Sequence, residues 1–315
     1  MSVPLVSVLI PCFNAARYIG ETLESVFRQT WPAIEIVVID DGSTDGSARE
    51  ISRIARSNLL FVKAEHRGAA ASRNEAVERS SGDFIQYLDA DDLISPDKIS
   101  LQIRRLIESP RSIASCEWGR FYTRAQDTRF NPEAVWCDLG PLEWLAASRA
   151  DGLGMMFPAL WLIPRSIVTL AGPWNDNLAV LDDTEYFTRV ILQAEQVLFC
   201  ADARACYRSG IRGSLSGRKS PSAWLSQFKA IDLSEQHVLA RENSERMRRG
   251  FALSWQHLAH SIYPYDPKLA EKALVRARTL HTVRIDPDGG LAFRWLSHLV
   301  GWRAARRLQV ASGRQ

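Results

Sequence analysis

Three aspartates stand within four positions, directly behind an apolar run. The run is Phe84 to Leu88, and the acids are Asp89, Asp91 and Asp92. Like charges this close repel one another, so we expect a positive group among them. Carboxylate oxygens are the hard ligands that Mg²⁺ and Mn²⁺ prefer. The spacing therefore predicts a charged site where a strand ends, and its partner is a metal ion, a lysine or only water.

The elements that would position these acids follow a repeating pattern. Four apolar, β-branched runs predict strands at residues 6–10, 34–39, 59–62 and 84–88. Each is followed by a helical pattern, at residues 14–27, 45–54, 69–79 and 99–107. Four strand-then-helix units in succession predict an α/β fold with a mainly parallel, Rossmann-like sheet and helices on both faces.

A polar cluster follows the end of each predicted strand. The four clusters are Pro11-Cys12-Phe13-Asn14, Asp40-Asp41-Gly42-Ser43, His66-Arg67-Gly68 and Asp89-Ala90-Asp91-Asp92. In open α/β sheets, ligands bind in the crevice beyond the carboxyl ends of the strands. Asp and Ser also cap helices, so one cluster alone is equally consistent with a cap or a solvated turn. Four clusters at one edge favour a binding site.

The bulk composition narrows the function classes. With 315 residues, 46% of them hydrophobic, the chain can build about two domains' worth of core. The net charge of +3 gives no argument for nucleic-acid binding. Five cysteines without a C-x-x-C pair are typical of a reducing, cytoplasmic compartment. We expect neither a signal peptide nor a membrane span, because no basic leader and no 18-residue apolar run occur.

Four blocks of the sequence resemble the inverting family-two glycosyltransferases of the GT-A fold. They are VSVLIPCFNAARYIGETLESVFRQT, IEIVVIDDGSTDGS, HRGAAASRNEAV and DFIQYLDADDLISPDKI. The resemblance covers residues 3 to about 216. It implies that Asp40 and Asp41 contact the base and ribose of a nucleotide-sugar donor and that Arg67 lies near the base. The strand-one cluster residues assigned to the same donor site are Pro11, Phe13 and Asn14.

The resemblance also answers the question of the positive group. It makes Asp89-Ala90-Asp91 a D-x-D motif that engages the ribose and a divalent metal, Mn²⁺ or Mg²⁺. Such an ion offsets the negative charge of the departing nucleotide diphosphate and acts as a Lewis acid. Asp91 is then the main protein ligand, Asp89 lies chiefly on the ribose, and Asp92 caps the next helix.

A second resemblance lies in AGPWNDNLAVLDDTEYFTRVIL, residues 171–192. Members of the family carry an acidic pair here and an arginine six residues later, which match Asp182, Asp183 and Arg189. Asp183 matches the general base that takes a proton from the acceptor hydroxyl. A helix dipole would hold this carboxylate ionised, as a base requires, although an N-cap acid is the plainer alternative. Trp161 and Trp174 flank this segment and are candidates for stacking on the acceptor, with core packing as the alternative.

One departure from the family concerns the segment after Tyr207. Many relatives carry a histidine that completes the metal site, where this chain has Ile211. Arg208 and Arg212 can neutralise the diphosphate instead, because arginine forks suit phosphate oxygens. A solvated basic loop is the alternative.

These observations predict two domains. Residues 1–220 form the GT-A domain, with a donor half to about 115 and an acceptor and base half from about 116, and residues 221–315 form a helical extension. The predicted reaction is inverting transfer from a nucleotide-diphosphate sugar, with uracil the commonest base in the family, to a glycan or lipid-linked acceptor in polysaccharide biosynthesis. The alternatives are a non-catalytic nucleotide-sugar-binding module and a D-x-D phosphotransferase or phosphatase, whose nucleophilic aspartate should follow the first strand.

The stretch LAFRWLSHLVGWRAARRL, residues 291–308, predicts an amphipathic helix. Trp295 and Leu299 lie on its apolar face, and three arginines follow near its end. Such a helix covers the protein's own core or lies in a membrane interface with its tryptophans at headgroup depth. The second alternative predicts peripheral contact with the inner face of the membrane.

Overall fold

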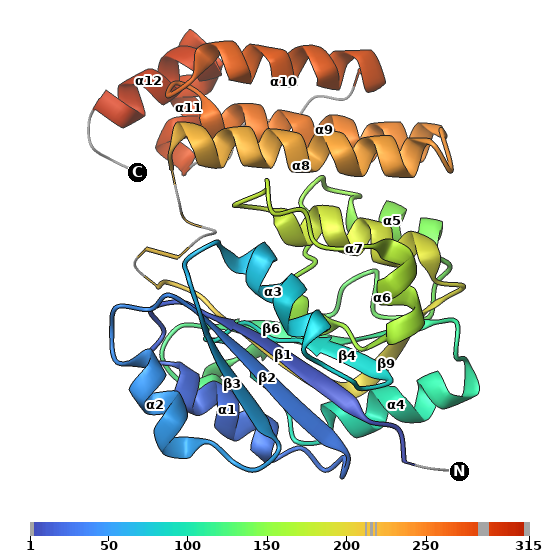
Figure 1. Cartoon of the computed structure of the whole chain (residues 1–315). Helices are drawn as coiled ribbons and strands as arrows, with labels where there is room; N and C mark the ends of the chain where they lie inside the picture. The colour runs from blue at the N-terminus through green and yellow to red at the C-terminus, as the bar shows by residue number, and fades with distance from the viewer. Residues whose placement is uncertain (1–2, 212, 215–216, 218, 283–289, 312–315) are drawn as a thin grey trace. The chain divides into compact units, whose positions relative to one another are not determined.

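A five-stranded sheet forms the centre of the first part of the chain. The computed structural model describes residues 3–211, 213–214, 217, 219–282 and 290–311. The sheet has the order β3-β2-β1-β4-β8 (Figure 1). Its strands are β1 (Val6–Cys12), β2 (Ile34–Asp41), β3 (Leu59–Ala64), β4 (Phe84–Tyr87) and β8 (Ile163–Pro164). The first four run parallel, and β8 pairs antiparallel with β4, so the predicted mainly parallel α/β sheet is confirmed.

Helices cover both faces of this sheet. Helices α1, α2 and α4 lie along one face in Figure 1, and α3, α6 and α7 lie along the other. Every residue of β1 and β4 is buried, which explains why these strands are continuous apolar runs rather than alternating ones. The bounds are α1 (Ile19–Phe27), α2 (Ser47–Ile54), α3 (Ala69–Glu78), α4 (Lys98–Glu108), α5 (Pro141–Ser148), α6 (Arg165–Ala171) and α7 (Asp182–Gln193).

The chain enters a second sheet directly after the D-x-D segment. Its order is β5-β9-β6-β7. The strands are β5 (Leu93–Ile94), β6 (Ile113–Phe121), β7 (Arg129–Phe130) and β9 (Val197–Arg208). Strand β9 pairs antiparallel with β5 and parallel with β6, so its last residues come beside the D-x-D turn.

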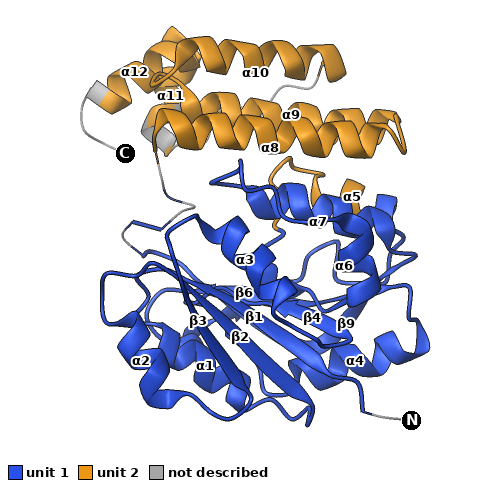
Figure 2. Ribbon diagram, viewed as in Figure 1, with its two compact units in different colours: residues 1–144, 156–218 blue, residues 145–155, 219–315 orange. Residues whose placement is uncertain are grey.

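The chain divides into two compact units (Figure 2). The first comprises residues 1–144 and 156–218, and the second comprises residues 145–155 and 219–315. The sequence placed the boundary at 220 and assigned the stretch 145–155 to the acceptor half; in the structure that stretch groups with the helical unit. Sequence periodicity shows where helices lie, but it does not show which hydrophobic core a short segment joins.

The second unit is helical, as predicted. It contains α8 (Pro221–Leu239), α9 (Glu245–Ile262), α10 (Pro267–Leu280), α11 (Leu291–Val300) and α12 (Trp302–Ala311). Side chains cap three of these helices by accepting the backbone N–H three residues later, namely Ser220, Ser244 and Asp266. In its interior, the Nε1–H of buried Trp255 donates to Glu235 at 2.6 Å.

The last segment differs from the single helix that its sequence predicts. Gly301 has a φ of 78° and separates α11 from α12. Trp295 is 73% exposed and Leu299 is 72% exposed, so this face of α11 is not packed on a core. No helix of the described residues combines the length and apolar character that a membrane crossing requires.

Candidate active site

The loops after β1 and β2 are joined through Asn14. Its Oδ1 accepts the backbone N–H of Thr44 at 2.8 Å, and its own N–H donates to Ser43 Oγ at 2.9 Å. Asn14 has a φ of 50°, a conformation that Asn tolerates better than most residues. Helix α1 begins at Ile19, later than the helical pattern predicted from residue 14, and it has no side-chain cap. Pro11 is buried within β1.

Asp40 and Asp41, at the end of β2, organise the neighbouring loops. Asp40 Oδ1 accepts the N–H of Ser43 at 3.1 Å. Asp41 is 3% exposed and accepts the N–H groups of Arg67 and Gly68 at 2.8 and 2.9 Å. It thereby fixes the β3–α3 loop, while the Arg67 guanidinium is half-exposed and pairs with Glu75 at 2.6 Å.

An exposed aromatic pair lies beside Asp41. The rings of Phe13 and His66 stack with centroids 4.2 Å apart and an interplanar angle of 23°. His66 Nδ1 lies 2.8 Å from Asp41 Oδ2, which holds the imidazole in this orientation. Phe13 is 41% exposed, so a planar base can stack on this surface. The sequence indicated Phe13 for the donor site but not His66, because nothing in its local pattern places the imidazole against that ring.

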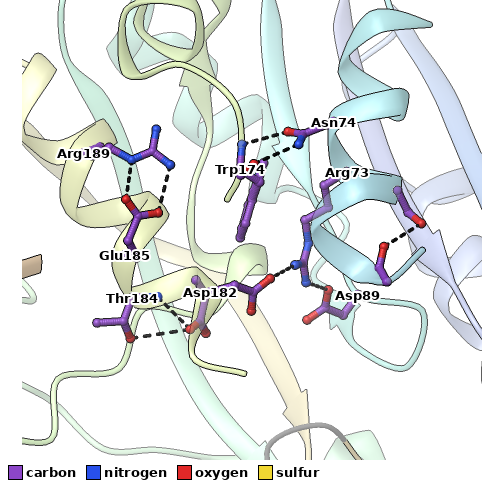
Figure 3. A network of polar contacts seen from close by, with 11 residues as sticks. Arg73, Asn74, Asp89, Trp174, Asp182, Thr184, Glu185 and Arg189 are labelled. Carbon is purple, nitrogen blue, oxygen red and sulfur yellow. Dashed lines mark hydrogen bonds and ion pairs between the residues drawn. The ribbon is translucent and has the colours of Figure 1, made fainter. Parts of the chain in front are cut away.

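Arg73 is the centre of the site, and the sequence reasoning missed it. Its Nη2 donates to Asp89 at 2.7 Å and its Nη1 donates to Asp182 at 2.8 Å (Figure 3). Arg73 is 5% exposed. The positive group beside Asp89 is thus an arginine, which was not among the three partners first considered. One signal could have found it: Arg73 lies three residues from both Ala70 and Ala76, on the face of α3 that is buried.

The two candidate acceptor tryptophans are packing residues. Trp161 is 0% and Trp174 is 1% exposed, so neither indole presents a surface to an acceptor. The Arg73 guanidinium lies 4.4 Å from the ring centroid of Trp174. The Trp174 ring also stacks on the Tyr186 ring, with centroids 3.9 Å apart. Its backbone N–H and C=O bond the Asn74 amide at 2.8 and 2.9 Å (Figure 3). The indole therefore holds Arg73 in place rather than binding a sugar.

The D-x-D turn is tied to the end of β9. Asp92 is 1% exposed, and its Oδ1 accepts the backbone N–H of Arg208 at 2.8 Å. The Arg208 guanidinium donates to the carbonyl of Asp91 at 2.8 Å and pairs with Glu21 at 2.6 Å. Asp92 thus links two segments instead of capping a helix, and buried Arg208 is a structural cation of this turn. Arg212 lies outside the described residues.

Burial and repulsion between like charges raise the pKa values of Asp91 and Asp92. The pKa of Asp91 rises to about 7, because the group is largely desolvated and Asp89 is close. The pKa of Asp92 is raised well above its ordinary value by burial and by its two acidic neighbours. Both groups therefore gain from a cation that compensates their negative charge.

The acidic pair opens α7, as the resemblance implied. Asp182 is the first residue of α7, and the preceding Leu181 has a left-handed φ of 64°. Burial and the charge of Asp182 raise the pKa of Asp183 to about 7, although Arg73 opposes the shift. Desolvation thus opposes the ionised form of Asp183 that the helix dipole is expected to favour. A pKa near neutrality suits a group that must take a proton and later release it.

Arg189, six residues after Asp183, has a structural role. It pairs with Glu185 at 2.6 Å (Figure 3). It also donates to the carbonyls of Ala171 and Pro173. These contacts fasten α7 to the preceding segment. They fix the direction in which the helix presents its acidic pair.

The D-x-D carboxylates fit a divalent ion. Asp91 is a hard oxygen ligand beside the buried Asp92, whose Oδ2 has no hydrogen-bond partner among the described residues. No cluster of three or more His, Cys, Asp or Glu side chains with metal-binding geometry occurs in the described part of the chain. Mg²⁺ and Mn²⁺ suit such a site, because Mg²⁺ in particular is commonly held by one or two carboxylates together with substrate phosphates and water.

Comparison with known proteins identifies the family of this chain. WfgD of Escherichia coli, described as "UDP-Glc:alpha-D-GlcNAc-diphosphoundecaprenol beta-1,3-glucosyltransferase", is 34% identical over 106 residues, which cover 33% of this chain and 42% of WfgD. The aligned segments span about half or less of several other curated relatives.

Solved structures share the fold over most of the chain. The structure of Staphylococcus aureus TarS residues 1–349 with UDP-GlcNAc has a TM-score of 0.61 and 16% identity, covering 90% of this chain and 94% of that one. The mannosyltransferase PcManGT from Pyrobaculum calidifontis, solved with GDP-Man and Mn²⁺, has a TM-score of 0.57 and 19% identity, covering 98% and 84%. These likenesses confirm the predicted GT-A-like fold. The family profile described as "Glycosyl transferase family 2" matches residues 7–168, and the chain therefore belongs to glycosyl transferase family 2.

Proposed function

We propose that the protein transfers a sugar from a nucleotide-diphosphate sugar, a UDP-sugar, to an acceptor hydroxyl with inversion at the anomeric carbon. The observation that carries this proposal is the pair of ion pairs made by Arg73, which bring Asp89 of the D-x-D motif and Asp182 of the acidic pair to one guanidinium. Donor-side and acceptor-side acids thereby meet in one site. The relatives that act on or were solved with UDP-sugars support the choice of base.

The donor is held at the carboxyl ends of β1, β2 and β4. Phe13 and His66 offer a stacked surface for the base, and Asp41 holds the loop beside it. Asp89 accepts from the ribose, oriented by its ion pair with Arg73. Asp91, with Asp89, would hold Mn²⁺ or Mg²⁺. When bound, this ion supplies Lewis-acid compensation of the charge on the leaving diphosphate.

Asp183 acts as the general base in this proposal. Its carboxylate takes the proton of the acceptor hydroxyl while that oxygen forms a bond to the anomeric carbon. The bond between this carbon and the diphosphate oxygen breaks on the opposite face, so the configuration inverts and a nucleoside diphosphate leaves. Arg73 stabilises the ionised base electrostatically, because its charge opposes the rise in the pKa of Asp183.

A donor screen tests this function. UDP-glucose, UDP-N-acetylglucosamine and GDP-mannose are added to the full chain with Mn²⁺, and the melting temperature is measured. A ligand of the folded state raises that temperature with concentration. We expect a UDP-sugar to raise it more than GDP-mannose does, and we expect slow hydrolysis of the same donor. No response to any nucleotide sugar would contradict the proposal, and binding without hydrolysis or transfer would favour the non-catalytic binding module.

We further propose that the acceptor is a lipid-linked glycan and that α11 rests on an anionic membrane surface. Trp295 and Leu299 are four positions apart, on one side of α11, and are each more than 70% exposed. Exposed arginines of α12 follow, including Arg303 and Arg307. Apolar residues at the interface and cations near anionic headgroups are complementary to such a leaflet. The lipid-diphosphate acceptor in the description of WfgD fits this placement.

Co-sedimentation with vesicles tests the membrane contact. The full chain and a Trp295→Ser/Leu299→Ser variant are spun with phosphatidylglycerol vesicles at low salt. Leu225→Ser, which alters an exposed leucine of α8, is the matched control. We expect only the double variant to lose most of its binding. Equal sedimentation of all three proteins would contradict the contact while leaving the sugar-transfer proposal intact.

A further inference from the structure

A buried pair of tyrosines joins the two segments that carry the acidic groups of the site. Tyr87 is the last residue of β4, two positions before Asp89. Tyr186 belongs to α7, three positions after Asp183, so it lies one turn further along on the same side of the helix. The two hydroxyl oxygens are 2.9 Å apart and share a hydrogen bond. This contact connects β4 with α7 independently of the two ion pairs of Arg73.

The hydrogen bond is shielded from water and packed against the site. Tyr87 and Tyr186 are both 0% exposed. The Trp174 ring stacks on the Tyr186 ring with an interplanar angle of 11°, and it meets the Tyr87 ring edge-on with centroids 5.2 Å apart. The Arg73 guanidinium lies over the same indole. One side chain thus contacts both the tyrosine pair and the cation that binds the two acids.

Stability alone does not explain the two hydroxyl groups. Phenylalanine at both positions would fill nearly the same space and leave no polar atom to satisfy, and such paired replacements are close to neutral or stabilising. The cost of taking two hydroxyls out of water is only roughly offset by the one hydrogen bond between them. What the hydrogen bond adds is direction, because it fixes the separation and orientation of two rings that apolar contact alone would allow to slide.

A slide of α7 along β4 would disturb the site. It would move Asp182 relative to Asp89, and the two acids are held by one guanidinium at 2.8 and 2.7 Å. It would also move Asp183, the base of the proposed reaction, relative to the donor. A misplacement of about 1 Å between reacting groups can lower a rate by about a hundredfold.

We propose that Tyr87 and Tyr186 are positioning residues, whose hydrogen bond fixes the register of α7 against β4 and with it the place of Asp183. Both side chains are fully buried, so they act through the elements that carry them and not by touching a substrate. The effect on the transfer rate rests on the proposed function, whereas the effect on the register of α7 does not.

Removing one or both hydroxyls from the full chain tests this role. Tyr186→Phe leaves the Tyr87 hydroxyl buried without its partner, so both the melting temperature and the transfer rate should fall. In Tyr87→Phe/Tyr186→Phe no unpaired hydroxyl remains, so the melting temperature should recover. The transfer rate per folded molecule of this double variant should nevertheless stay lower than that of the unaltered chain by a factor of about ten or more, with donor affinity within about twofold.

Phe187→Leu is the matched control, because Phe187 is also fully buried on α7 and takes no part in the hydrogen bond. It should lower the melting temperature and leave the transfer rate per folded molecule unchanged. A double variant that transfers sugar as fast as the unaltered chain would overturn the proposal. An equal loss of rate in Phe187→Leu, or a parallel loss of donor affinity in the double variant, would overturn it too.

Amide hydrogen exchange gives a second readout that does not depend on activity. In the double variant, the backbone N–H groups of residues 186–190 of α7 should exchange faster by a factor of about ten, because the helix is held less firmly, whereas those of α4 should keep their rates. Unchanged exchange in α7 would overturn the proposal. If the unaltered chain turns over no nucleotide sugar, the proposed function fails and the exchange rates alone decide whether the hydrogen bond holds α7.

Discussion

Arg73 and Asp182, 109 positions apart in the sequence, are joined by an ion pair of 2.8 Å. The same guanidinium holds Asp89 at 2.7 Å. Removing one partner from a buried pair leaves an uncompensated charge, so this arrangement couples Asp89 and Asp182, which belong to the proposed donor side and base side of the site.

The first prediction concerns pH. The pKa of Asp183 is raised from its ordinary value of 3.8 to about 7, so the carboxylate is mostly protonated below pH 7. A general base must be ionised, and kcat/KM should therefore rise with pH through about 7 and then level off. Initial rates of transfer at subsaturating substrate between pH 5 and 9 measure this. A profile that is flat across this range would show that Asp183 does not titrate as the base.

The second prediction concerns Arg73→Gln. Its charge opposes the rise in the pKa of Asp183, so its loss should move the pH profile of kcat/KM to higher pH and lower the rate at pH 7. The free energy of unfolding should fall by about 3 kcal/mol, as when a buried pair is broken. Arg73→Lys should restore part of the lost stability and part of the shift in the pH profile. Arg79→Gln, an exposed arginine that follows the same helix, is the control and should change neither.

Transfer rates and urea denaturation of the Arg73 variants separate an electrostatic role of Arg73 from a structural one. A purely structural Arg73 would lower stability and leave the midpoint of the pH profile unchanged. That outcome would remove the electrostatic role assigned to it here.

The third prediction concerns Asp91→Asn. Loss of one hard ligand should abolish the dependence of donor affinity on Mn²⁺, while the melting temperature without ligand stays the same or rises, because a carboxylate with a raised pKa is removed. Titration calorimetry with the donor, with and without Mn²⁺, is the measurement. Asp202→Asn, at a carboxylate that is 81% exposed, should behave like the unaltered chain. Unchanged metal dependence in Asp91→Asn would place the ion elsewhere.

Much of the fold was accessible from the sequence, because strand period and helix period are local properties. The four strand-and-helix units of the first hundred residues lie where their patterns predict, and Asp89, Asp91 and Asp183 follow from a family resemblance in order and spacing. The helical character of the second unit was equally visible, although the break between α11 and α12 at Gly301 was not. The helices of this unit also carry ordinary capping residues, such as Ser244 and Asp266.

The contacts that organise the site were not accessible, because they join residues far apart in the chain. Nothing near Arg73 in the sequence indicates that it will meet Asp182. From the sequence, Trp174 is equally consistent with a sugar-stacking residue and with a packing residue. Its exposed fraction of 1% in the structure shows that it is a packing residue. The raised pKa of Asp183 depends on desolvation, which local sequence does not report. Tertiary burial thus outweighed the helix-dipole argument.

The fourth prediction tests the central claim, that Asp183 is the base of a sugar transfer. Asp183→Asn keeps the size and polarity of the side chain but cannot accept the proton. The pKa of Asp183 is higher in the folded chain than in the unfolded one, so the contribution of Asp183 to stability declines as pH rises from about 4 to about 7. Above pH 7, the free energy of unfolding of Asp183→Asn should therefore be at least as high as that of the unaltered chain. Asp176→Asn, an exposed carboxylate in the segment before α7, is the matched control.

The most direct measurement compares donor affinity and transfer rate in the same Asp183→Asn preparation, by titration calorimetry and by release of the nucleoside diphosphate in the presence of acceptor. We predict donor affinity within about twofold of the unaltered chain and a transfer rate lower by a factor of about one hundred or more. Loss of donor binding in parallel with transfer, or a transfer rate equal to that of Asp176→Asn, would contradict the assignment of Asp183 as the base.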